Sequence, residues 1–435
     1  MSSRPGPTSA TITRFAARFA CIGAACEDTC CAFDWHVRLD RPDYSRLKAA
    51  LAGSPAERER LERGCERLPD GERPGHHFAV LRRTPAGRCV FLEPDGLCAV
   101  HRDHGAAALP RVCASYPRVP TRIGDRLAVT TALSCPEAAR LCLLAGDAVE
   151  EVPAEPGPLA HLLVRHHLPE TGDDPFVRGF LEIRAAFVSL LGRRDLPVPS
   201  RLHAALHLAH ALDAVRAGPR ATADARTRAA VAAGVSEATL GRLHRECGAG
   251  SPSREGPAVL VEEMLVALLR EQGATRLAAL IHLALDHFRG IAEPRRARPP
   301  RAADAGLVAA YERGRRAWEG AFPERIARYA TNGAVNFWLR DPFTAAPDLA
   351  SHALDLCARL AAIRFLLFTH PAIREVGAPA VGDPAHAAVL DRAAVEVVYT
   401  FSRAVEHGDG TRERLRALAV EHARGRRQEL DLVRF

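Results

Sequence analysis

The spacing of hydrophobic and polar residues changes about one third of the way along the chain. In the first part, residues 34–40 alternate between the two types, as in a short strand. Residues 119–133 form two apolar runs around Gly124 and Asp125, which predicts a β-hairpin. We therefore expect strands to be confined to roughly the first 135 residues.

From about residue 160 onward the apolar residues recur at helical spacing. Between the two patterns, residues 146–158 are acidic and rich in proline, which is typical of a linker. The sequence contains no βαβ alternation and no glycine-rich phosphate loop, so we do not expect a Rossmann-type nucleotide domain. Three stretches each place four apolar residues on one helix face: Leu277, Ile281, Ala284 and Phe288; Ile326, Ala330, Gly333 and Phe337; and Ala394, Val398, Phe401 and Val405.

These patterns predict a mainly α protein with two domains. An N-terminal α+β domain is expected over residues 1–147, packed on a larger helical domain over residues 158–435. The chain has 435 residues, of which 47% are hydrophobic, which is enough for two or three domains with sizeable cores.

Ten of the twelve cysteines lie between residues 21 and 142, inside the predicted N-terminal domain. Thiolates bind zinc and iron–sulfur clusters, and four of them complete a tetrahedral zinc site or hold a [4Fe–4S] cluster. We therefore predict a cysteine-rich metal-binding domain whose sulfur atoms converge in space. The eight candidate ligands are Cys21, Cys26, Cys30, Cys31, Cys89, Cys98, Cys113 and Cys135.

The cysteine spacing leaves several alternatives open. It does not separate zinc from an iron–sulfur cluster, and the adjacent Cys30 and Cys31 point in different directions, so they serve two sites or one of them only packs. Any single cysteine can also be a small buried residue. Cys247 and Cys357, far from the others, are predicted to be core residues of this kind.

Charge and composition limit the classes of partner. The net charge is +7, and almost all of the positive charge is arginine, because Lys48 is the only lysine. The densest basic run, residues 294–304, is broken by prolines and has the pattern of a solvated loop, so nucleic-acid binding is not expected. No run of 18 apolar residues is present and the N-terminus lacks a signal-peptide core, so we expect a cytoplasmic protein without membrane insertion.

Several motifs resemble those of the flagellin lysine-N-methylase family. The segment "FACIGAACEDTCCAFDWHVRLDRPDYSRL" is similar to the N-terminal signature of that family. "DGLC", "CASYPR" and "LSCPEAARL" match its central pattern. "RYATNGAVNFWLRDPF" resembles its asparagine-bearing helix, and "YTFSRAVEH" resembles its C-terminal helix. The resemblance implies a protein-lysine methyltransferase that uses S-adenosylmethionine and carries an iron–sulfur cluster, with flagellin or another surface protein bearing exposed lysines as substrate.

Within the asparagine-bearing segment, Tyr329, Asn332, Asn336 and Arg340 form one polar stripe at helical spacing. A solvated face is the simplest explanation, but asparagine and tyrosine are poor choices for such a face in a chain rich in Arg, Glu and Ala. With the resemblance, Tyr329, Asn332 and Asn336 become candidate cofactor-binding residues.

The C-terminal segment supplies the remaining candidates. Arg403, Glu406 and His407 share one helix face, where a salt bridge is the structural alternative. We expect Arg403 to hold the cofactor carboxylate and Glu406 or His407 to act on the substrate ammonium, because a lysine must lose its proton before it attacks a methyl group. Arg118, between two cysteine positions, is a further candidate for cofactor binding.

Two other classes of function stay open at this point. One is a non-catalytic protein that chelates zinc or iron, and the other is a redox sensor whose thiols or cluster switch a partner. Both require the cysteines, but neither requires the polar helix faces.

Overall fold

The computed structural model describes residues 6–32, 35–69, 77–250, 253, 255–271, 275–289, 305–407, 410–423 and 425–435. The basic run at 294–304 lies outside these residues. The chain divides into two compact units. The N-terminal unit comprises Met1–Ala138 and Glu151–His167, and the helical unit comprises Ala139–Glu150 and Leu168–Phe435.

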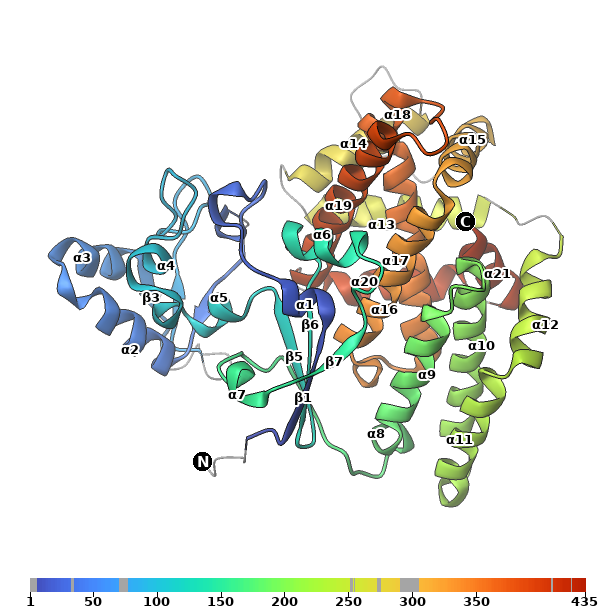
Figure 1. The fold of residues 1–435 in the computed structure, drawn as a ribbon, viewed down its shortest axis with the longest axis horizontal. Helices are drawn as coiled ribbons and strands as arrows, with labels where there is room; N and C mark the ends of the chain where they lie inside the picture. Colours follow the sequence, from blue (N-terminus) through green and yellow to red (C-terminus); the bar gives the residue numbers. More distant parts are fainter. Residues whose placement is uncertain are drawn as a thin grey trace. The chain divides into compact units, whose positions relative to one another are not determined.

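A five-stranded sheet organises the N-terminal unit, with the strand order β7-β1-β6-β5-β8 (Figure 1). The first strand of the chain pairs in parallel with β6 and antiparallel with β7. β5 and β6 form the predicted hairpin, and Gly124 at its turn has a φ of 58°, which a glycine adopts at little cost. The strands are β1 (Ser9–Thr13), β5 (Arg118–Ile123), β6 (Arg126–Thr131), β7 (Glu151–Ala154) and β8 (His166–Leu168).

A second, three-stranded sheet and several short helices complete this unit. The sheet has the order β2-β4-β3, from β2 (Arg38–Leu39), β4 (Ala79–Leu81) and β3 (Cys65–Arg67). The α-helices are α1 (Arg14–Arg18), α2 (Arg41–Ala50), α3 (Pro55–Gly64), α4 (Ala99–His104), α5 (Arg111–Ser115) and α7 (Pro156–Leu159). The division between the units falls within α6 (Pro136–Leu144).

Every described strand lies in the N-terminal unit or at its boundary, and the described elements after β8 are all helices. Helix α17 is buried along almost its whole length and packs against α10, α13, α14, α19 and α20. The helices are α8 (Pro175–Arg178), α9 (Phe180–Gly192), α10 (Val198–Arg216), α11 (Ala223–Gly234), α12 (Glu237–Gly248), α13 (Glu255–Glu271), α14 (Arg276–Arg289), α15 (Ala305–Ala321), α16 (Pro323–Arg340), α17 (Leu349–Thr369), α18 (Pro371–Val376), α19 (Pro384–His407), α20 (Thr411–His422) and α21 (Arg426–Arg434).

The predicted fold class, mainly α with an N-terminal α+β part, is confirmed. Two details of the strand prediction are wrong. Residues 146–158 were expected to be a linker, but they contain β7, whose pairing with β1 makes it an edge of the large sheet. β8 also lies beyond residue 135, as a three-residue edge strand. The alternating segment 34–40 contains only the two-residue β2, and Asp34 lies outside the described residues.

Among the described helices, none combines the length and the apolar composition that crossing a lipid bilayer requires.

Candidate functional site

Four of the eight candidate cysteines gather in one hydrophobic core of the N-terminal unit. Cys31, Cys89, Cys98 and Cys113 all belong to, or pack against, one hydrophobic cluster that also contains Cys65. The backbone joins two of them directly, because the Cys89 amide donates to the Cys31 carbonyl at 2.7 Å. We call these four residues the core cysteine group.

The charges of the core group interact. Burial raises the pKa of Cys113 well above the usual thiol value, and the neighbouring Cys31, Cys89 and Cys98 raise it further. Burial likewise raises the pKa of Cys89 to about 11, with contributions from Cys31 and Cys98. If these four thiols were ionised, their negative charges would repel one another. A bound cation offsets this repulsion.

Of the other four candidates, Cys21, Cys26 and Cys135 interact with one another, and we call them the outer cysteine group. Burial raises the pKa of Cys135 to about 11, and Cys26 and Cys21 add to the effect. Cys30 lies between the groups: its pKa is raised by a hydrogen bond with Cys31, by burial, and by the charges of Cys31, Cys113 and Cys135. The pKa of Cys31 is lowered in turn, first by the hydrogen bond from Cys30.

These observations bear on the predicted metal site. The donor chemistry fits a thiolate-bound metal or cluster, and no disulfide joins the cysteines in the described part of the chain. However, no group of three or more His, Cys, Asp or Glu among the described residues is arranged to hold a metal ion. The choice of ligands therefore stays a prediction. Cys247 and Cys357 are buried in the helical unit, as predicted.

Arg83 is a structural residue of the core cysteine group that sequence reasoning missed. Its guanidinium donates to the Cys31 carbonyl at 2.8 Å and to the Trp35 carbonyl at 2.6 Å, so it connects Cys31 with Trp35. Its charge also contributes to lowering the pKa of Cys31. A single arginine in an arginine-rich chain carries no local sequence signal for such a role.

Arg118, a predicted cofactor-binding residue, lies in the N-terminal unit. It donates to the Phe19 carbonyl at 2.9 Å, and its guanidinium lies over the Phe19 ring at 5.2 Å. Burial lowers the pKa of Arg118. Arg118 therefore fixes the backbone two residues before Cys21, and its role toward a cofactor stays a prediction.

In the helical unit, the polar stripe of α16 is buried rather than solvated. Asn332 is fully buried, and Asn336 and Arg340 are 2% and 5% exposed. The residues of the predicted apolar face are less buried, since Ile326 and Ala330 are only half-buried. The structural alternative of a solvated face is therefore wrong for α16.

Two residues of the stripe are already bound to other parts of the protein. The Tyr329 hydroxyl donates to Asp391 of α19, which also accepts from Arg325 at 2.6 Å. The amide nitrogen of Asn332 donates to the Cys142 carbonyl at 2.7 Å and the Ala145 carbonyl at 2.9 Å. Asn332 thus satisfies carbonyls at the C-terminal end of α6, which have no partner inside that helix.

We expect Asn332→Ala to reduce the free energy of unfolding by about 1–3 kcal/mol, because it leaves buried carbonyls unsatisfied. Urea unfolding of the full chain measures the loss. Gly333→Ala is the control on the same helix: a Cβ there meets nothing within 4 Å, and stability should rise by about 0.5–1 kcal/mol. An Asn332→Ala protein as stable as the wild type would contradict the structural role.

The end of the α16 stripe meets the C-terminal candidates in one charged cluster. Arg340 forms ion pairs with Asp341 and with Glu406 of α19. Asp341 forms a second pair with Arg412 of α20, at 2.9 Å. Since Tyr329 contacts Asp391 and Arg340 contacts Glu406, α16 and α19 run in the same direction along this contact. We call Arg340, Asp341, Glu406 and Arg412 the buried charge cluster.

The pKa values of Arg340 and Asp341 in this cluster differ strongly from their usual values. Burial lowers the pKa of Arg340 to about 10. Burial alone would raise the pKa of Asp341, but the charges of Arg340, Arg412 and Arg359 outweigh it and hold that pKa far below the usual range. The second oxygen of Glu406, Oε2, is buried and has no hydrogen-bond partner among the residues that the structure describes.

The sequence analysis did not single out two residues beside the cluster. Arg359 pairs with Asp355 at 2.6 Å and lies over the Phe337 ring at 5.2 Å. Burial lowers the pKa of His352 to about 3, so this imidazole is neutral near pH 7. Both lie on α17, whose near-continuous apolar character gave no sign that its polar residues face a charged site.

Arg403 and His407 also lie on α19. Arg403 is 5% exposed and its guanidinium lies over the Tyr399 ring at 5.2 Å, while His407 is half-buried. The structure therefore brings Glu406 and the α16 stripe together through Arg340, and it places Arg403 in the buried part of the same helix.

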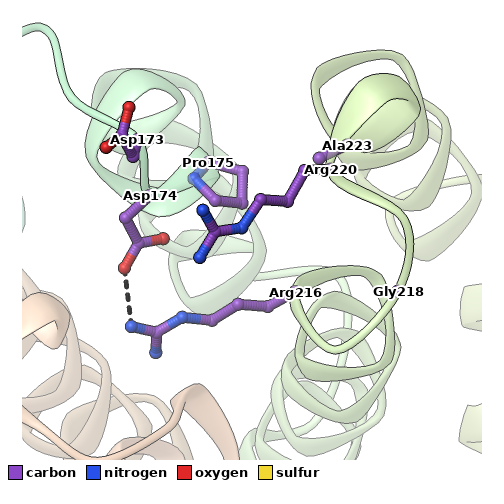
Figure 2. Close-up of a pocket in the computed structure, with 7 residues that line it drawn as sticks. All are labelled: Asp173, Asp174, Pro175, Arg216, Gly218, Arg220 and Ala223. Atoms are coloured by element: carbon purple, nitrogen blue, oxygen red, sulfur yellow. Dashed lines mark hydrogen bonds and ion pairs between the residues drawn. The ribbon is translucent and has the colours of Figure 1, made fainter.

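Two surface pockets of the helical unit contain none of the predicted site residues. One of about 340 Å³ lies between α8 and the segment before α11; it is shown in Figure 2, where Asp174 and Arg216 face each other at 2.6 Å and Arg220 extends into the same space. Its charged residues are exposed except Asp174, which is half-buried. The other, of about 250 Å³, is lined by residues of α13 and α20–α21, including His422.

The fold and these sites define a class: a mainly helical protein with a cysteine-rich α+β unit and a buried charge cluster. Residues 184–424 match the FliB lysine N-methylase C-terminal domain family, which is more than half of the chain. The chain therefore belongs to the FliB lysine N-methylase family, and the predicted resemblance is confirmed. The buried charge cluster lies entirely within the matched residues.

Individual relatives match over a shorter stretch. The chain is 29% identical over 136 residues to the lysine-N-methylase of Salmonella typhimurium and to that of Salmonella choleraesuis, covering 31% of this chain and 32% of each relative. It has the same identity to the flagellar biosynthetic protein FliU of Salmonella muenchen, covering 77% of that protein. The match thus spans about a third of each lysine-N-methylase. No solved structure matches the chain.

Proposed function

We propose that this protein transfers a methyl group from S-adenosylmethionine to the ε-amine of a lysine on a partner protein. The observation that carries the proposal is the family match over residues 184–424, which includes the polar stripe of α16 and the C-terminal part of α19. Flagellin or another surface protein with exposed lysines is the proposed substrate, since one relative is named as a flagellar biosynthetic protein.

S-adenosylmethionine supplies an electrophilic methyl group on a sulfonium. In the polar form of the reaction, the nitrogen lone pair of the lysine forms a bond to the methyl carbon, and the carbon–sulfur bond breaks. Its electron pair stays on sulfur, and the nitrogen releases one proton. The protein must therefore receive an ammonium group and lead a proton away from it.

Glu406 and His407 are the proposed groups for this step. The open Oε2 of Glu406 is an acceptor for an ammonium group, and its negative charge favours a cation in a buried setting. His407 is the next residue and is half-buried, so it offers a route for a proton toward solvent.

For the cofactor, Arg403 and Asn336 are the proposed binding residues on the helical unit. Both are buried polar residues of the two helices that meet at the charge cluster. Tyr329 and the amide nitrogen of Asn332 already bind Asp391 and the α6 carbonyls, so only the Oδ1 of Asn332, buried without a partner among the described residues, is open to a ligand.

The cysteines are proposed to hold an iron–sulfur cluster, with zinc as the alternative. The support is the gathering of four of them around one hydrophobic cluster, a number that suits a [4Fe–4S] cluster or a tetrahedral zinc ion. Such a cluster would supply structural closure of the N-terminal unit or redox chemistry.

Isothermal titration of the anaerobically purified full chain with S-adenosylmethionine tests the cofactor assignment. We expect Arg403→Ala to weaken binding by about 10- to 100-fold, corresponding to a charge-assisted contact of about 1.5–3 kcal/mol. Arg216→Ala is the matched control, since Arg216 also lies over an aromatic ring, Phe176, but borders a separate pocket. Unchanged binding in Arg403→Ala and Asn336→Ala would refute the assigned site.

The non-catalytic alternative is favoured by one observation. The adjacent Cys30 and Cys31 share a hydrogen bond that makes Cys31 the more acidic thiol, which is a property of redox-active cysteines. A protein that contains metal but binds no S-adenosylmethionine would support this alternative over methyl transfer.

A further inference from the structure

The two carboxylates of the buried charge cluster have different numbers of ion-pair partners. Asp341 is held by two guanidinium groups, those of Arg340 and Arg412. Glu406 is held by Arg340 alone, through Oε1. Both side chains are at least nine-tenths buried, at 5% and 8% exposed. In the described structure, the only oxygen of the pair left without a partner is therefore Oε2 of Glu406.

An open buried carboxylate oxygen is costly. Burying a polar group without a hydrogen bond costs about 1–3 kcal/mol, and more for a charged group. Stability alone favours a second donor on Glu406, as Asp341 has in Arg412. A purely structural ion pair explains the contact with Oε1, but it does not explain the open oxygen.

The position of Arg340 explains why only one oxygen of Glu406 is engaged. One end of its planar guanidinium contacts Asp341 and another nitrogen, Nη1, contacts Glu406, so the group bridges the two carboxylates. Asp341 is itself held by Arg412 through its other oxygen, Oδ1, at 2.9 Å. The planar guanidinium of Arg340 therefore determines the orientation of the Glu406 carboxylate.

We infer that Arg340 is a positioning residue that holds Glu406 by one oxygen and presents the other oxygen to the ammonium group of the substrate lysine. This inference rests on the proposed function and deepens it, because it assigns the cationic end of the substrate to one atom. Arg340 does not contact the substrate; it acts through Glu406.

The test uses the anaerobically purified full chain and n-butylammonium, which reproduces the lysine side chain beyond Cα. Saturation-transfer NMR titration gives its dissociation constant, and n-butanol serves as the uncharged ligand of similar length. We expect Glu406→Gln and Arg340→Gln each to weaken n-butylammonium binding at least tenfold and to leave n-butanol binding unchanged. Arg340→Lys keeps the charge but lacks the rigid planar guanidinium that fixes the geometry of two carboxylates. This variant should bind between the wild type and Glu406→Gln.

Arg315→Gln is the matched control. Arg315 forms a similarly buried pair with Glu312 on α15, at 2.6 Å, with both side chains 8% exposed. This variant should lose stability but keep the wild-type affinity for n-butylammonium, which separates a positioning role from a structural one. If Arg340→Gln does not fold, Arg340→Lys decides the question.

Wild-type affinity for n-butylammonium in Arg340→Lys or in a folded Arg340→Gln would overturn the inference. So would absence of binding by a wild-type protein that does bind S-adenosylmethionine. A wild-type protein that binds neither ligand would instead refute the proposed function. A selective loss of the charged ligand in both Glu406 and Arg340 variants would support the inference.

Discussion

Asp341→Ala is expected to lower the free energy of unfolding by about 3–5 kcal/mol, because it leaves the buried Arg340 and the half-buried Arg412 without their shared carboxylate. Urea unfolding of the full chain, followed by circular dichroism of the helices, measures the loss. The matched control is Asp224→Ala, whose exposed pair with Arg178 at 2.7 Å should contribute less than about 1 kcal/mol. Equal losses in the two variants would contradict the importance of burial.

The same cluster should make the wild-type protein sensitive to acid. The folded pKa of Asp341 is depressed, so its contribution is complete above the unfolded pKa near 4 and is lost as the pH falls below it. His352 has a folded pKa of about 3, so its unfolded form takes up a proton first, below about pH 6.5. As the pH falls, each of these two groups should lower the free energy of unfolding by up to about 1.4 kcal/mol per pH unit. Flat stability between pH 6.5 and 4 would contradict the assignment for His352.

Cys31→Ser is expected to remove most of the bound metal from the anaerobically purified protein. Cys31 belongs to the core group with Cys89, Cys98 and Cys113, and it also interacts with Cys30. A serine oxygen is a poor ligand for the soft metals that thiolates bind. Elemental analysis for iron and zinc, with acid-labile sulfide, should give about four irons per chain for one [4Fe–4S] cluster in the wild type.

Cys65→Ser is the matched control for this experiment. Cys65 is buried in the same hydrophobic cluster but is not one of the eight candidate ligands, and burial raises its pKa to about 11. We expect this variant to keep its metal. Full metal content in Cys31→Ser, or equal loss in Cys31→Ser and Cys65→Ser, would remove Cys31 from the ligand set.

The helical part of the fold was predictable because its signal is local. Apolar residues at a spacing of three and four mark a buried helix face, and Leu277, Ile281, Val398 and Phe401 are buried as expected. The hairpin of β5 and β6 was equally predictable, since its turn and both strands lie within 14 residues. β7 was missed because its partner β1 lies about 140 residues away, and no local pattern records such a pairing.

The candidate site was likewise only partly predictable from the sequence. The sequence by itself determined the residue types: a set of thiols, a polar stripe of Asn and Arg on one helix, and Arg, Glu and His on another. Only the tertiary structure decided which of them meet. It placed Cys31 with Cys89, Cys98 and Cys113 in one small core, bound the amide of Asn332 to α6, and joined Arg340 to Glu406.

The physical reason lies in the range of the interactions. Helical and strand periodicity come from backbone geometry over a few residues, so a sequence displays them directly. An ion pair such as Arg340–Glu406 depends on the packing of α16 against α19, and its effect depends on burial, which lowers the local dielectric. The sequence therefore determined the mainly helical fold and the chemistry available to this protein, and the tertiary structure decided which groups are buried, which are paired, and that one oxygen of Glu406 is left open.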